Sequence, residues 1–593
     1  MPVVATAGHV DHGKSTLVRA LTGMEPDRWA EERRRGMTID LGYAWTTLPS
    51  GAQLAFVDVP GHQRFIANML AGLGPAPAVL FVVAADEGWS RQSAEHLAAI
   101  DALEVRHGLL AVTRSDLADP APARREALGR LARSSLGELD SVTVSGITAQ
   151  GIDELRTALD RLLASLPAAD RAARVRLWVD RSFTARGSGT VVTGTLSAGA
   201  VAVGDELELR GRRVTVRGVQ SLGEQRERVE AVGRVALNLR AVDRDEIGRG
   251  DVLVTPGAWH WTRTVDVRLA SAEQLPAELV LHVGTASESV HLRPLGGGGG
   301  LVRLATRRPL PIQAGDRAVL RDPGRQSVAA GVLVLDADPP PFTRRGAAGR
   351  RADELATALG RPDPRVEIER RGSVRRDRMA ALGIALDDLA DVRSVGEWLV
   401  GEPTWRGWVR AAPAAVAEWA ARSPLEPAMP LTALVRALGL PAHDVLAPLL
   451  ADAQLHIRNG RVGPTEPASS LGTAEDGVRS IEAQLRDAPF AAPESTDLAD
   501  LGLGRRELAA AERAGRLVRI SADIVLLPSA PAVALEALRA LPQPFTTSQA
   551  RQALGTTRRV AVPLLEYLDE HDRTERVDGS TRRVRKAAET HVS

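Results

Sequence analysis

Residues 3–21 read VVATAGHVDHGKSTLVRAL. The apolar run over residues 3–7 predicts a buried strand, and the pattern that follows the next turn predicts a helix. Between them, residues 8–15 match G-x-x-x-x-G-K-S, in the strand and helix context that confirms a phosphate-binding loop. Backbone N–H groups and a helix N-terminus attract phosphates, so Lys14 is expected at the β and γ phosphates and Ser15 at a Mg²⁺ ion.

Lysine is rare in this chain, which contains only Lys14 and Lys586. Arginine occupies almost every other basic position, so Lys14 is retained where arginine is otherwise preferred. A compact ammonium group suits the phosphate oxygens of such a loop in a way that a broad guanidinium does not. This composition therefore supports the phosphate-binding role.

The bulk composition limits the class of protein. A chain of 593 residues predicts several domains, and no apolar stretch approaches the roughly 20 residues that span a bilayer. The N-terminus carries no secretory signal, so a cytoplasmic protein without membrane association is expected. The absence of cysteine excludes disulfides, thiolate metal sites and cysteine nucleophiles. A net charge of +1 gives no whole-chain case for nucleic acid, so any RNA contact must be local.

Short apolar runs alternate with helical patterns as far as about residue 163. This alternation predicts a parallel sheet wrapped by helices. The predicted strands are residues 3–7, 54–58, 79–84, 109–113 and 142–144.

The pattern changes twice further along the chain. From about residue 174 to residue 338, β-branched runs cut by Gly and Asp turns predict two small β-barrels, with Gly296 to Gly300 as a flexible loop tip in the second. After three prolines the composition becomes rich in Ala, Leu and Arg and predicts mostly helix. Hairpin patterns recur there about every 60 residues, which suits helix-turn-helix modules with a β-hairpin wing. These hairpins are residues 455–462, 517–526 and 574–581.

Residues 8–16 resemble the phosphate loop of the elongation factor Tu class of translational GTPases, and further motifs follow in the order of that class. Residues 35–40, RGMTID, resemble the first switch, and residues 58–62, DVPGH, resemble the second. The resemblance implies that Thr38 completes the Mg²⁺ shell and that Asp58 contacts the ion through water.

The second switch implies the catalytic residues. Gly61 would contact the γ phosphate through its N–H, and His62 would position the attacking water, with Val10 and Ile39 as apolar gates on either side until the ribosome reorients His62. The resemblance thus assigns catalysis to His62, Lys14 and Gly61, and Mg²⁺ to Ser15, Thr38 and Asp58. GTP and GDP would be bound by Asp11, His12, Gly13, Lys14, Ser15, Thr16, Asp58, Gly61, Thr113, Arg114, Asp116, Ser145, Gly146 and Ile147.

The base-recognition motif departs from the class. Where the class has Asn-Lys-x-Asp, this chain has Thr113-Arg114-Ser115-Asp116. Asp116 can accept hydrogen bonds from the N1 and N2 donors of guanine, and adenine offers no matching pair. The stem of Arg114 can cover the base as lysine would, but Thr113 lacks the amide. Residues 145–147 take the place of the Ser-Ala-x loop of the class.

Residues 178–194, WVDRSFTARGSGTVVTG, resemble the second domain of elongation factor Tu, which cradles the aminoacyl end of tRNA. When the two are aligned on Phe183, elongation factor Tu has two acidic residues where this chain has Asp180-Arg181. A selenol is anionic at neutral pH, so a partly desolvated guanidinium favours it over serine or cysteine. Asp180, Arg181 and, as a second cation, Arg240 are therefore the candidates for a selenocysteyl pocket. The alternative is a surface ion pair on a barrel strand.

Elongation factor Tu ends after its third domain, whereas the selenocysteine-specific elongation factors of bacterial type, the SelB family, continue into winged-helix modules that bind an mRNA hairpin. This chain continues in the same way. Residues 545–560 predict a helix, a glycine turn and a second helix that begins with two arginines, a pattern that suits phosphates and looped-out bases. The candidate RNA-binding residues are Arg551, Arg558, Arg559, Arg573, Arg576, Arg582, Arg583 and Arg585.

The expected fold is multidomain: an α/β P-loop GTPase domain, two β-barrels and a mostly helical C-terminal array of winged-helix modules. The resemblance implies a monomer that carries selenocysteinyl-tRNA to the ribosome at a recoded UGA codon. The expected boundaries are 1–170 for the GTP-binding domain, 174–258 for the barrel at the aminoacyl end, 259–340 for the second barrel, and 343–410, 411–466, 470–530 and 531–593 for the winged helices.

Two other functions remain open from the sequence. One is a different tRNA-handling GTPase, such as an initiation-type factor or an elongation factor Tu with an extension. The other is a GTPase whose winged-helix tail binds DNA, because winged helices also enter the major groove.

Overall fold

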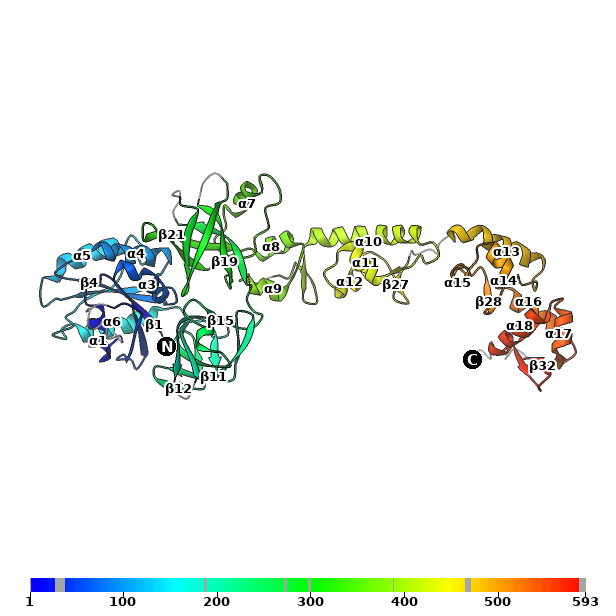
Figure 1. Cartoon of the computed structure of the whole chain (residues 1–593), viewed down its shortest axis with the longest axis horizontal. Coiled ribbons are helices and arrows are strands. Elements are labelled where there is room, and N and C mark those ends of the chain that lie inside the picture. The colour runs from blue at the N-terminus through cyan, green and yellow to red at the C-terminus, as the bar shows by residue number, and fades with distance from the viewer. Residues whose placement is uncertain are drawn as a thin grey trace. The chain divides into compact units, whose positions relative to one another are not determined.

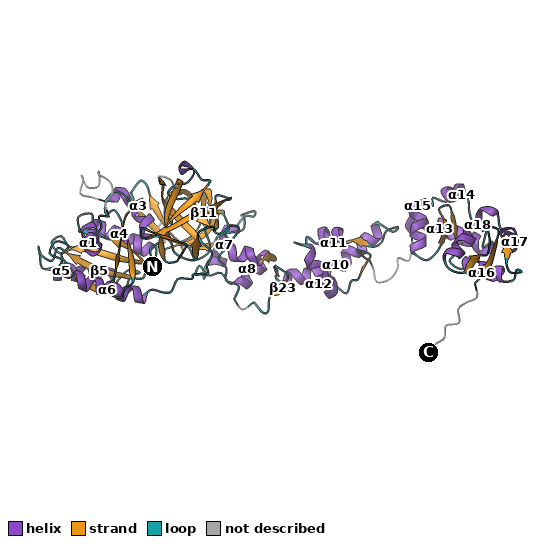
Figure 2. Ribbon diagram, turned by 90° about the horizontal axis from the view of Figure 1, so that it is seen from below, coloured by secondary structure: helices purple, strands orange, loops and turns teal. Residues whose placement is uncertain are grey.

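The computed structural model describes residues 2–26, 38–185, 189–270, 275–296, 300–387, 389–463 and 471–585. Three of the motifs quoted above fall partly outside these ranges: residues 35–37 of the first switch, 186–188 after the barrel strand and 297–299 of the glycine run. The chain forms two compact units, residues 1–370 with 374–391, and residues 371–373 with 392–593 (Figures 1 and 2).

The first unit begins with a six-stranded sheet of order β2-β3-β1-β4-β5-β6; β1 and β4 are labelled in Figure 1. The five predicted strands are present and run parallel. Strand β2 pairs antiparallel with β3 and was not predicted, because its sequence GYAWTT contains no continuous apolar run. The strands are β1 (Val3–Ala7), β2 (Gly42–Thr47), β3 (Gln53–Asp58), β4 (Ala78–Ala84), β5 (Gly108–Thr113) and β6 (Ser141–Thr143).

Helices cover both faces of this sheet, which explains why its central strands β1, β4 and β5 are buried at every position. Val4 packs among the side chains of α1 and α6, whereas Ala5 on the opposite face packs among those of α3, α4 and α5. The helices are α1 (Lys14–Thr22), η1 (Gln63–Phe65), α3 (Ile66–Leu73), α4 (Arg91–Ala102), α5 (Pro120–Leu131) and α6 (Ile152–Ser165).

Two barrels complete most of this unit. In the first, the sheet order is β10-β15-β7-β8-β14-β11-β12, and a further pairing of β10 with β11 closes the ring. The second barrel is closed in the order β16-β19-β18-β17-β20-β21. The first barrel contains β7 (Arg176–Ala185), β8 (Gly189–Leu196), β9 (Ala200–Ala202), β10 (Glu206–Leu209), β11 (Arg212–Ser221), β12 (Glu224–Arg226), β13 (Arg228–Glu230), β14 (Gly233–Arg240), η2 (Arg244–Glu246) and β15 (Val252–Val254). The second contains β16 (Thr262–Leu269), β17 (Glu278–Val283), β18 (Ala286–Pro294), β19 (Leu301–Leu310), β20 (Arg317–Asp322) and β21 (Ser327–Asp336).

The chain after the second barrel packs back onto it. Arg351 on α7 is buried and donates to the carboxylates of Asp266 (2.8 Å) and Asp336 (2.5 Å). This attachment explains why the boundary between the two compact units falls inside residues 343–410, which the sequence groups as one module. The elements of this stretch are α7 (Ala347–Leu355), α8 (Pro364–Arg371), β22 (Ser373–Arg375), α9 (Arg376–Ala381), β23 (Arg393–Val395) and β24 (Trp398–Val400).

The second unit repeats one order of elements: a helix, a short strand, two helices and a two-stranded hairpin. The middle repeat lacks the short strand. All three predicted hairpins are confirmed. The elements are α10 (Glu402–Arg422), β25 (Met429–Pro430), α11 (Leu431–Leu438), η3 (His443–Val445), α12 (Leu446–Asp452), β26 (Ile457–Arg458) and β27 (Arg461–Val462); then η4 (Gly472–Ala474), α13 (Glu475–Asp487), α14 (Ser495–Asp500), α15 (Arg505–Arg513), β28 (Val518–Ser521) and β29 (Ile524–Leu526); and finally α16 (Ala530–Arg539), β30 (Phe545–Thr546), α17 (Thr547–Ala553), α18 (Arg558–Glu570), β31 (Thr574–Arg576) and β32 (Thr581–Val584).

The last two repeats share one hydrophobic core. It runs from Leu471 to Leu568 and includes Ile481 on α13, Phe545 on β30 and Leu564 on α18. Within the described ranges, no single helix is long and apolar enough to span a bilayer; only the bent pair of α11 with the segment His443–Asp452 meets that measure of length and composition.

Candidate functional site

The loop between β1 and α1 is shaped by two glycines. Gly8 has a φ of +127°, and a Cβ placed on it would lie 2.2 Å from the carbonyl oxygen of Val82, so only glycine fits. Gly13 has a φ of +77° and begins α1 without a side-chain cap. The N–H groups at the start of α1 therefore point from the helix end into the loop, as an anion site requires.

Lys14 lies at the base of this loop. It is 3% exposed, and its Nζ donates to the carbonyl oxygens of Gly8 (3.0 Å) and His9 (2.6 Å). The ammonium group is thus held by the loop backbone beside the N-terminus of α1. Both features place positive charge where the sequence predicts phosphate.

Three side-chain oxygens converge beside the loop. The hydroxyl of Ser15 lies 2.9 Å from that of Thr38 and donates to Asp58 Oδ2 at 2.6 Å. Thr6 donates to the other oxygen of Asp58 (2.7 Å), which fixes the carboxylate from behind. These three side chains are the ones that the sequence assigns to Mg²⁺. Two hydroxyls and a buried carboxylate form the hard oxygen set that Mg²⁺ prefers, so the residues fit that ion.

Gly61 approaches the phosphate loop closely. A Cβ at this position would lie 2.5 Å from the Val10 N and 2.6 Å from Lys14 Nζ, so a side chain cannot be accommodated there. The next residue, His62, is partly exposed; its Nδ1 accepts a hydrogen bond from the N–H of Arg64 at 3.2 Å. The structure therefore brings the second-switch motif against the loop, with the predicted catalytic histidine directly after the contact.

Helix α4 holds the same two segments, a feature that the sequence analysis did not include. The N–H of Gly8 donates to Nδ1 of His96 (3.1 Å), and the other side of this ring bonds to the backbone of Gly61. One turn earlier, Gln92 accepts from the N–H of Val10 (3.2 Å). Burial lowers the pKa of His96 to about 3, so the imidazole is neutral and can accept at one nitrogen while it donates at the other.

Thr113 and Arg114, which replace the Asn and Lys of the base-recognition motif, both contact the phosphate loop. The hydroxyl of Thr113 donates to the carbonyl oxygen of His12 at 2.8 Å, which ties the end of β5 to the phosphate loop. Arg114 pairs with Asp86 (2.8 Å) and Glu87 (2.7 Å), and it also donates to the Asp11 carbonyl. The guanidinium is therefore anchored at three points.

Asp116 is exposed, as an acceptor for a guanine requires. It lines one hollow of about 600 Å³ together with the phosphate loop, Thr113, Arg114, Gly146 and Ile147. Ser145 is buried and accepts from the N–H of Ile147 (3.3 Å), so it shapes the adjoining turn.

His12 is the exception among the predicted nucleotide residues. Its side chain is fully buried and faces away from the loop toward Val82, with Nδ1 3.2 Å from that carbonyl oxygen. Burial lowers the pKa of His12 to about 4. Only its backbone is available to the nucleotide site.

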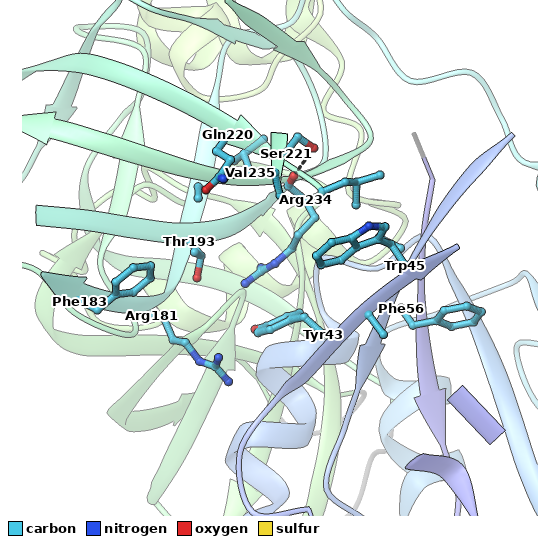
Figure 3. Close-up of a pocket in the computed structure, with 15 residues that line it drawn as sticks. Tyr43, Trp45, Phe56, Arg181, Phe183, Thr193, Gln220, Ser221, Arg234 and Val235 are labelled. Carbon is cyan, nitrogen blue, oxygen red and sulfur yellow. Dashed lines mark hydrogen bonds between the residues drawn. The ribbon is translucent and has the colours of Figure 1, made fainter. Parts of the chain in front are cut away.

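A second hollow lies between the sheet domain and the first barrel (Figure 3). Tyr43 on β2 forms its floor, and two guanidinium groups lie over the Tyr43 ring, Arg234 at 3.8 Å and Arg181 at 4.9 Å from its centroid. Phe183 and Thr193 line the barrel side. Both cations are largely buried, with 12% and 19% of their side chains exposed.

The three residues predicted for the selenocysteyl pocket do not all lie together. Asp180 is buried, pairs with Arg234 (2.7 Å) and accepts from Thr193 (2.7 Å). Arg240 is exposed at the far end of β14, outside the lining of this hollow, so its assignment as the second cation is corrected to Arg234. The two arginines lie on the same face of the strand, but six residues separate them by about 20 Å.

The arginines of the last repeat fall into groups with different environments. Arg582 is buried and pairs with Asp569 at 2.9 Å, and Arg559 donates to the carbonyl oxygen of Ala492 at 2.6 Å. Both are thus engaged within the protein. Acidic neighbours pair with Arg576, Arg583 and Arg585 at the surface. Within the described residues, no ion pair is recorded for Arg551, Arg558 and Arg573.

Comparisons with known proteins show which family the chain belongs to. Models of the elongation factor Tu GTP binding domain, the selenocysteine-specific elongation factor beta-barrel domain and the elongation factor SelB winged helix match residues 1–165, 262–341 and 536–583. A selenocysteine-specific elongation factor of Desulfomicrobium baculatum is 29% identical over 99% of this chain and 100% of its own length. Elongation factor Tu 2 of Streptomyces avermitilis is 33% identical over 43% of this chain and 72% of its own. The chain belongs to the selenocysteine-specific branch of the elongation factor Tu class of translational GTPases.

A crystal structure of a bacterial selenocysteine-specific elongation factor has the same fold. It superposes with a TM-score of 0.79, covers 99% of this chain and 100% of its own, and is 24% identical. As a translational GTPase, the protein is a GTP-binding elongation factor that hydrolyses GTP to GDP and phosphate. The expected combination of GTPase domain, barrels and winged helices is confirmed.

The sequence analysis of this translational GTPase did not identify the roles of Arg234, of Gln92 with His96, or of Tyr43. For the first two, the sequence contains a pattern that could have indicated them. Arg234 has the same strand parity as Arg240, so the alternation of β14 allows either one. Gln92 and His96 lie four residues apart on one face of α4. Tyr43 lies on the edge strand that was not predicted, and its role depends on a neighbour from the barrel.

Proposed function

We propose that the protein carries selenocysteinyl-tRNA, in its GTP form, to a ribosome stopped at a recoded UGA codon. The observation that carries this proposal is the pair of largely buried guanidinium groups, Arg181 and Arg234, over the Tyr43 ring. A selenolate carries a full negative charge, whereas serine offers a neutral hydroxyl. Cations removed from bulk water distinguish these two groups more strongly than exposed cations do.

We further propose roles for the nucleotide site. Lys14 and the N–H groups at the start of α1 hold the phosphates, Asp116 accepts from guanine, and His62 orients the attacking water. Ser15, Thr38 and Asp58 hold Mg²⁺, which supplies positive charge to the β and γ phosphates. This assignment is supported by the convergence of their three oxygens.

The C-terminal repeats are proposed to bind an mRNA hairpin. Arg551 and Arg558 support this assignment because they lie on α17 and at the start of α18 without recorded ion pairs in the described residues. A cation at a helix start is suited to phosphates and unstacked bases. Delivery to ribosomes would place the protein, as a monomer, in the cytoplasm.

The proposal is tested by comparing the binding of one tRNA that carries either selenocysteine or serine. The GTP form should bind selenocysteinyl-tRNA at least about tenfold more tightly than the same tRNA carrying serine, or roughly 1.4 kcal/mol. Arg181→Ala should remove most of this difference while leaving GTP affinity unchanged. Arg240→Ala, an exposed arginine of the same barrel, is the matched control and should retain the difference. Equal binding of both tRNAs by the unaltered protein would exclude the proposed specificity and favour another tRNA-handling GTPase.

A further inference from the structure

Asp40 is the last residue of the first-switch motif and connects three segments of the first unit. Its carboxylate pairs with Arg249, which lies between η2 and β15 of the first barrel. Its other oxygen lies 3.5 Å from the guanidinium of Arg181. Arg181 also donates to the carbonyl oxygen of Leu41, so the pocket cation in Figure 3 is held by residues 40 and 41.

Arg249 contacts more than this carboxylate. Its Nε donates to the carbonyl oxygen of Asp180 (2.9 Å), and a terminal nitrogen donates to Oδ1 of Asn68 on α3 (2.7 Å). Asn68 in turn donates to the carbonyl oxygen of Ile39 at 2.9 Å. The contacts therefore close a circuit through the strand that carries the pocket, the segment after Thr38 and the helix after His62.

The charges in this circuit leave the pocket positive. Among the described residues, Arg181 and Arg249 pair with the carboxylate of Asp40, and these three side chains carry two positive charges and one negative charge, a net charge of +1. Arginine keeps its charge at any physiological pH. Asp180 and Arg234 neutralise each other. The Arg181 guanidinium is thus oriented by Asp40 without being neutralised, because Arg249 takes the stronger share of that carboxylate.

We propose that Arg249 and Asp40 are positioning residues that orient the Arg181 guanidinium and make its orientation depend on the segment after Thr38. This inference rests on the proposed selenocysteyl pocket. Thr38 is at the Mg²⁺ ligand set, two residues before Asp40. Movement of Thr38 after loss of the γ phosphate displaces Asp40, and Arg181 and Arg249 then lose their shared partner.

The consequence is a coupling between the two sites. Affinity for the selenocysteyl end is high only while GTP holds Thr38 in place, and by linkage the bound tRNA stabilises the GTP form equally. Arg249 itself lines neither the nucleotide hollow nor the Tyr43 hollow. Substitution of Arg249 should therefore change the coupling and the tRNA selectivity. The affinity for nucleotide in the absence of tRNA should stay unchanged.

The test measures the dissociation constants of the full-length protein for selenocysteinyl-tRNA and seryl-tRNA in the GTP and GDP forms. Arg249→Ala should lower the ratio of GTP-form to GDP-form affinity for selenocysteinyl-tRNA at least about fivefold. Asp40→Asn, which keeps the size of the side chain, should do the same. Arg244→Ala is the matched control, since Arg244 lies on η2, is exposed and pairs only with Asp245 among the described residues; it should retain the original ratio.

Two failures can be distinguished. If the unaltered protein does not prefer selenocysteinyl-tRNA, the proposed function itself is wrong. If it does prefer that tRNA, and both Arg249→Ala and Asp40→Asn keep the original ratio and selectivity, only the positioning role is overturned. Thermal unfolding of each variant shows whether it is folded, and Arg249→Lys, which keeps the charge but not the planar fork, should retain more of the ratio than alanine.

Discussion

Histidines near the nucleotide site have different environments, and environment decides what each can do. His62 is partly exposed at the edge of the loop, whereas His12 and His96 are buried with pKa values lowered to about 4 and about 3. A buried neutral ring can hold backbone groups in place but cannot easily exchange protons with water. His62 is the one of the three with access to a water molecule.

His62→Ala should separate binding from chemistry. Its ring makes no recorded contact with the phosphate loop in the described residues, so GTP affinity should stay within about twofold. Ribosome-stimulated hydrolysis should fall by roughly two to three orders of magnitude, because orientation of the attacking water is lost. Single-turnover hydrolysis with ribosomes, beside fluorescent-nucleotide binding, measures both quantities. Stimulated turnover at the original rate would show that His62 has no such role.

At the residue scale, sequence reasoning was reliable where a motif fixes the spacing. Ser15, Thr38 and Asp58 converge because each belongs to a motif of the class. Arg240 was chosen without such a motif, and strand parity alone could not distinguish it from Arg234. Arg582 was assigned to RNA from its place in the basic wing and from the family resemblance, yet it is buried and pairs with Asp569 on α18.

At the scale of elements, α4 acts as a clamp on the phosphate loop. His96→Ala should weaken hydrolysis and GTP binding together, since Gly8 and Gly61 both lose a hydrogen-bond partner in the interior. Removing a buried partner costs about 1–3 kcal/mol per orphaned group, so a loss of about tenfold or more in GTP affinity is expected. Isothermal titration with GTP and GDP measures the effect, and Gln92→Ala provides a milder comparison at Val10. If both variants kept the original affinity for GTP, α4 would not be needed to hold the phosphate loop.

The clamp also predicts a pH dependence. The pKa of His96 in the folded protein is lowered to about 3, below its ordinary value near 6.5, so its neutral form contributes stability above pH 6.5 that is lost as the pH falls toward 3. His96→Gln removes this titration. The unfolding temperature of this variant should therefore fall less between pH 7 and pH 5 than that of the unaltered protein. An equal fall in unfolding temperature in both proteins would contradict the assignment. His12 and His282, whose pKa values burial lowers to about 4, contribute to the sensitivity that remains.

Elements were predicted well where periodicity was strong. The five parallel strands of the first sheet and the three hairpins of the second unit appear as expected. Strand β2 was missed because an edge strand of mixed polarity resembles a loop in sequence. Attachment of α7 to the second barrel was also beyond prediction, because it depends on Arg351 pairing with carboxylates that lie 85 and 15 residues earlier in the chain.

At the scale of the whole molecule, the proposed nucleotide site and the proposed RNA-binding residues lie in different compact units. Arg558→Ala should weaken binding of an mRNA hairpin by about 1–3 kcal/mol while GTP binding and intrinsic hydrolysis stay unchanged. Arg573→Ala tests whether the β-hairpin wing contributes to hairpin binding. Arg582 is buried, so Arg582→Ala should lower the stability of the protein instead. Competition between the hairpin and duplex DNA on the full-length protein provides the decisive comparison. Preference for the duplex would assign the second unit to DNA.

The common core of the last two repeats has a consequence for how this region can change. Phe545 and Leu564 belong to one buried cluster with side chains of the preceding repeat such as Ile481, so neither repeat buries its apolar face alone. The pair should melt in one cooperative transition and should be inherited, duplicated or transplanted as a single piece. A chimera that exchanges only the residues after 530 would have to pack a foreign repeat against the remaining half of the shared core. A graft that begins at residue 471 transfers both halves of that core together.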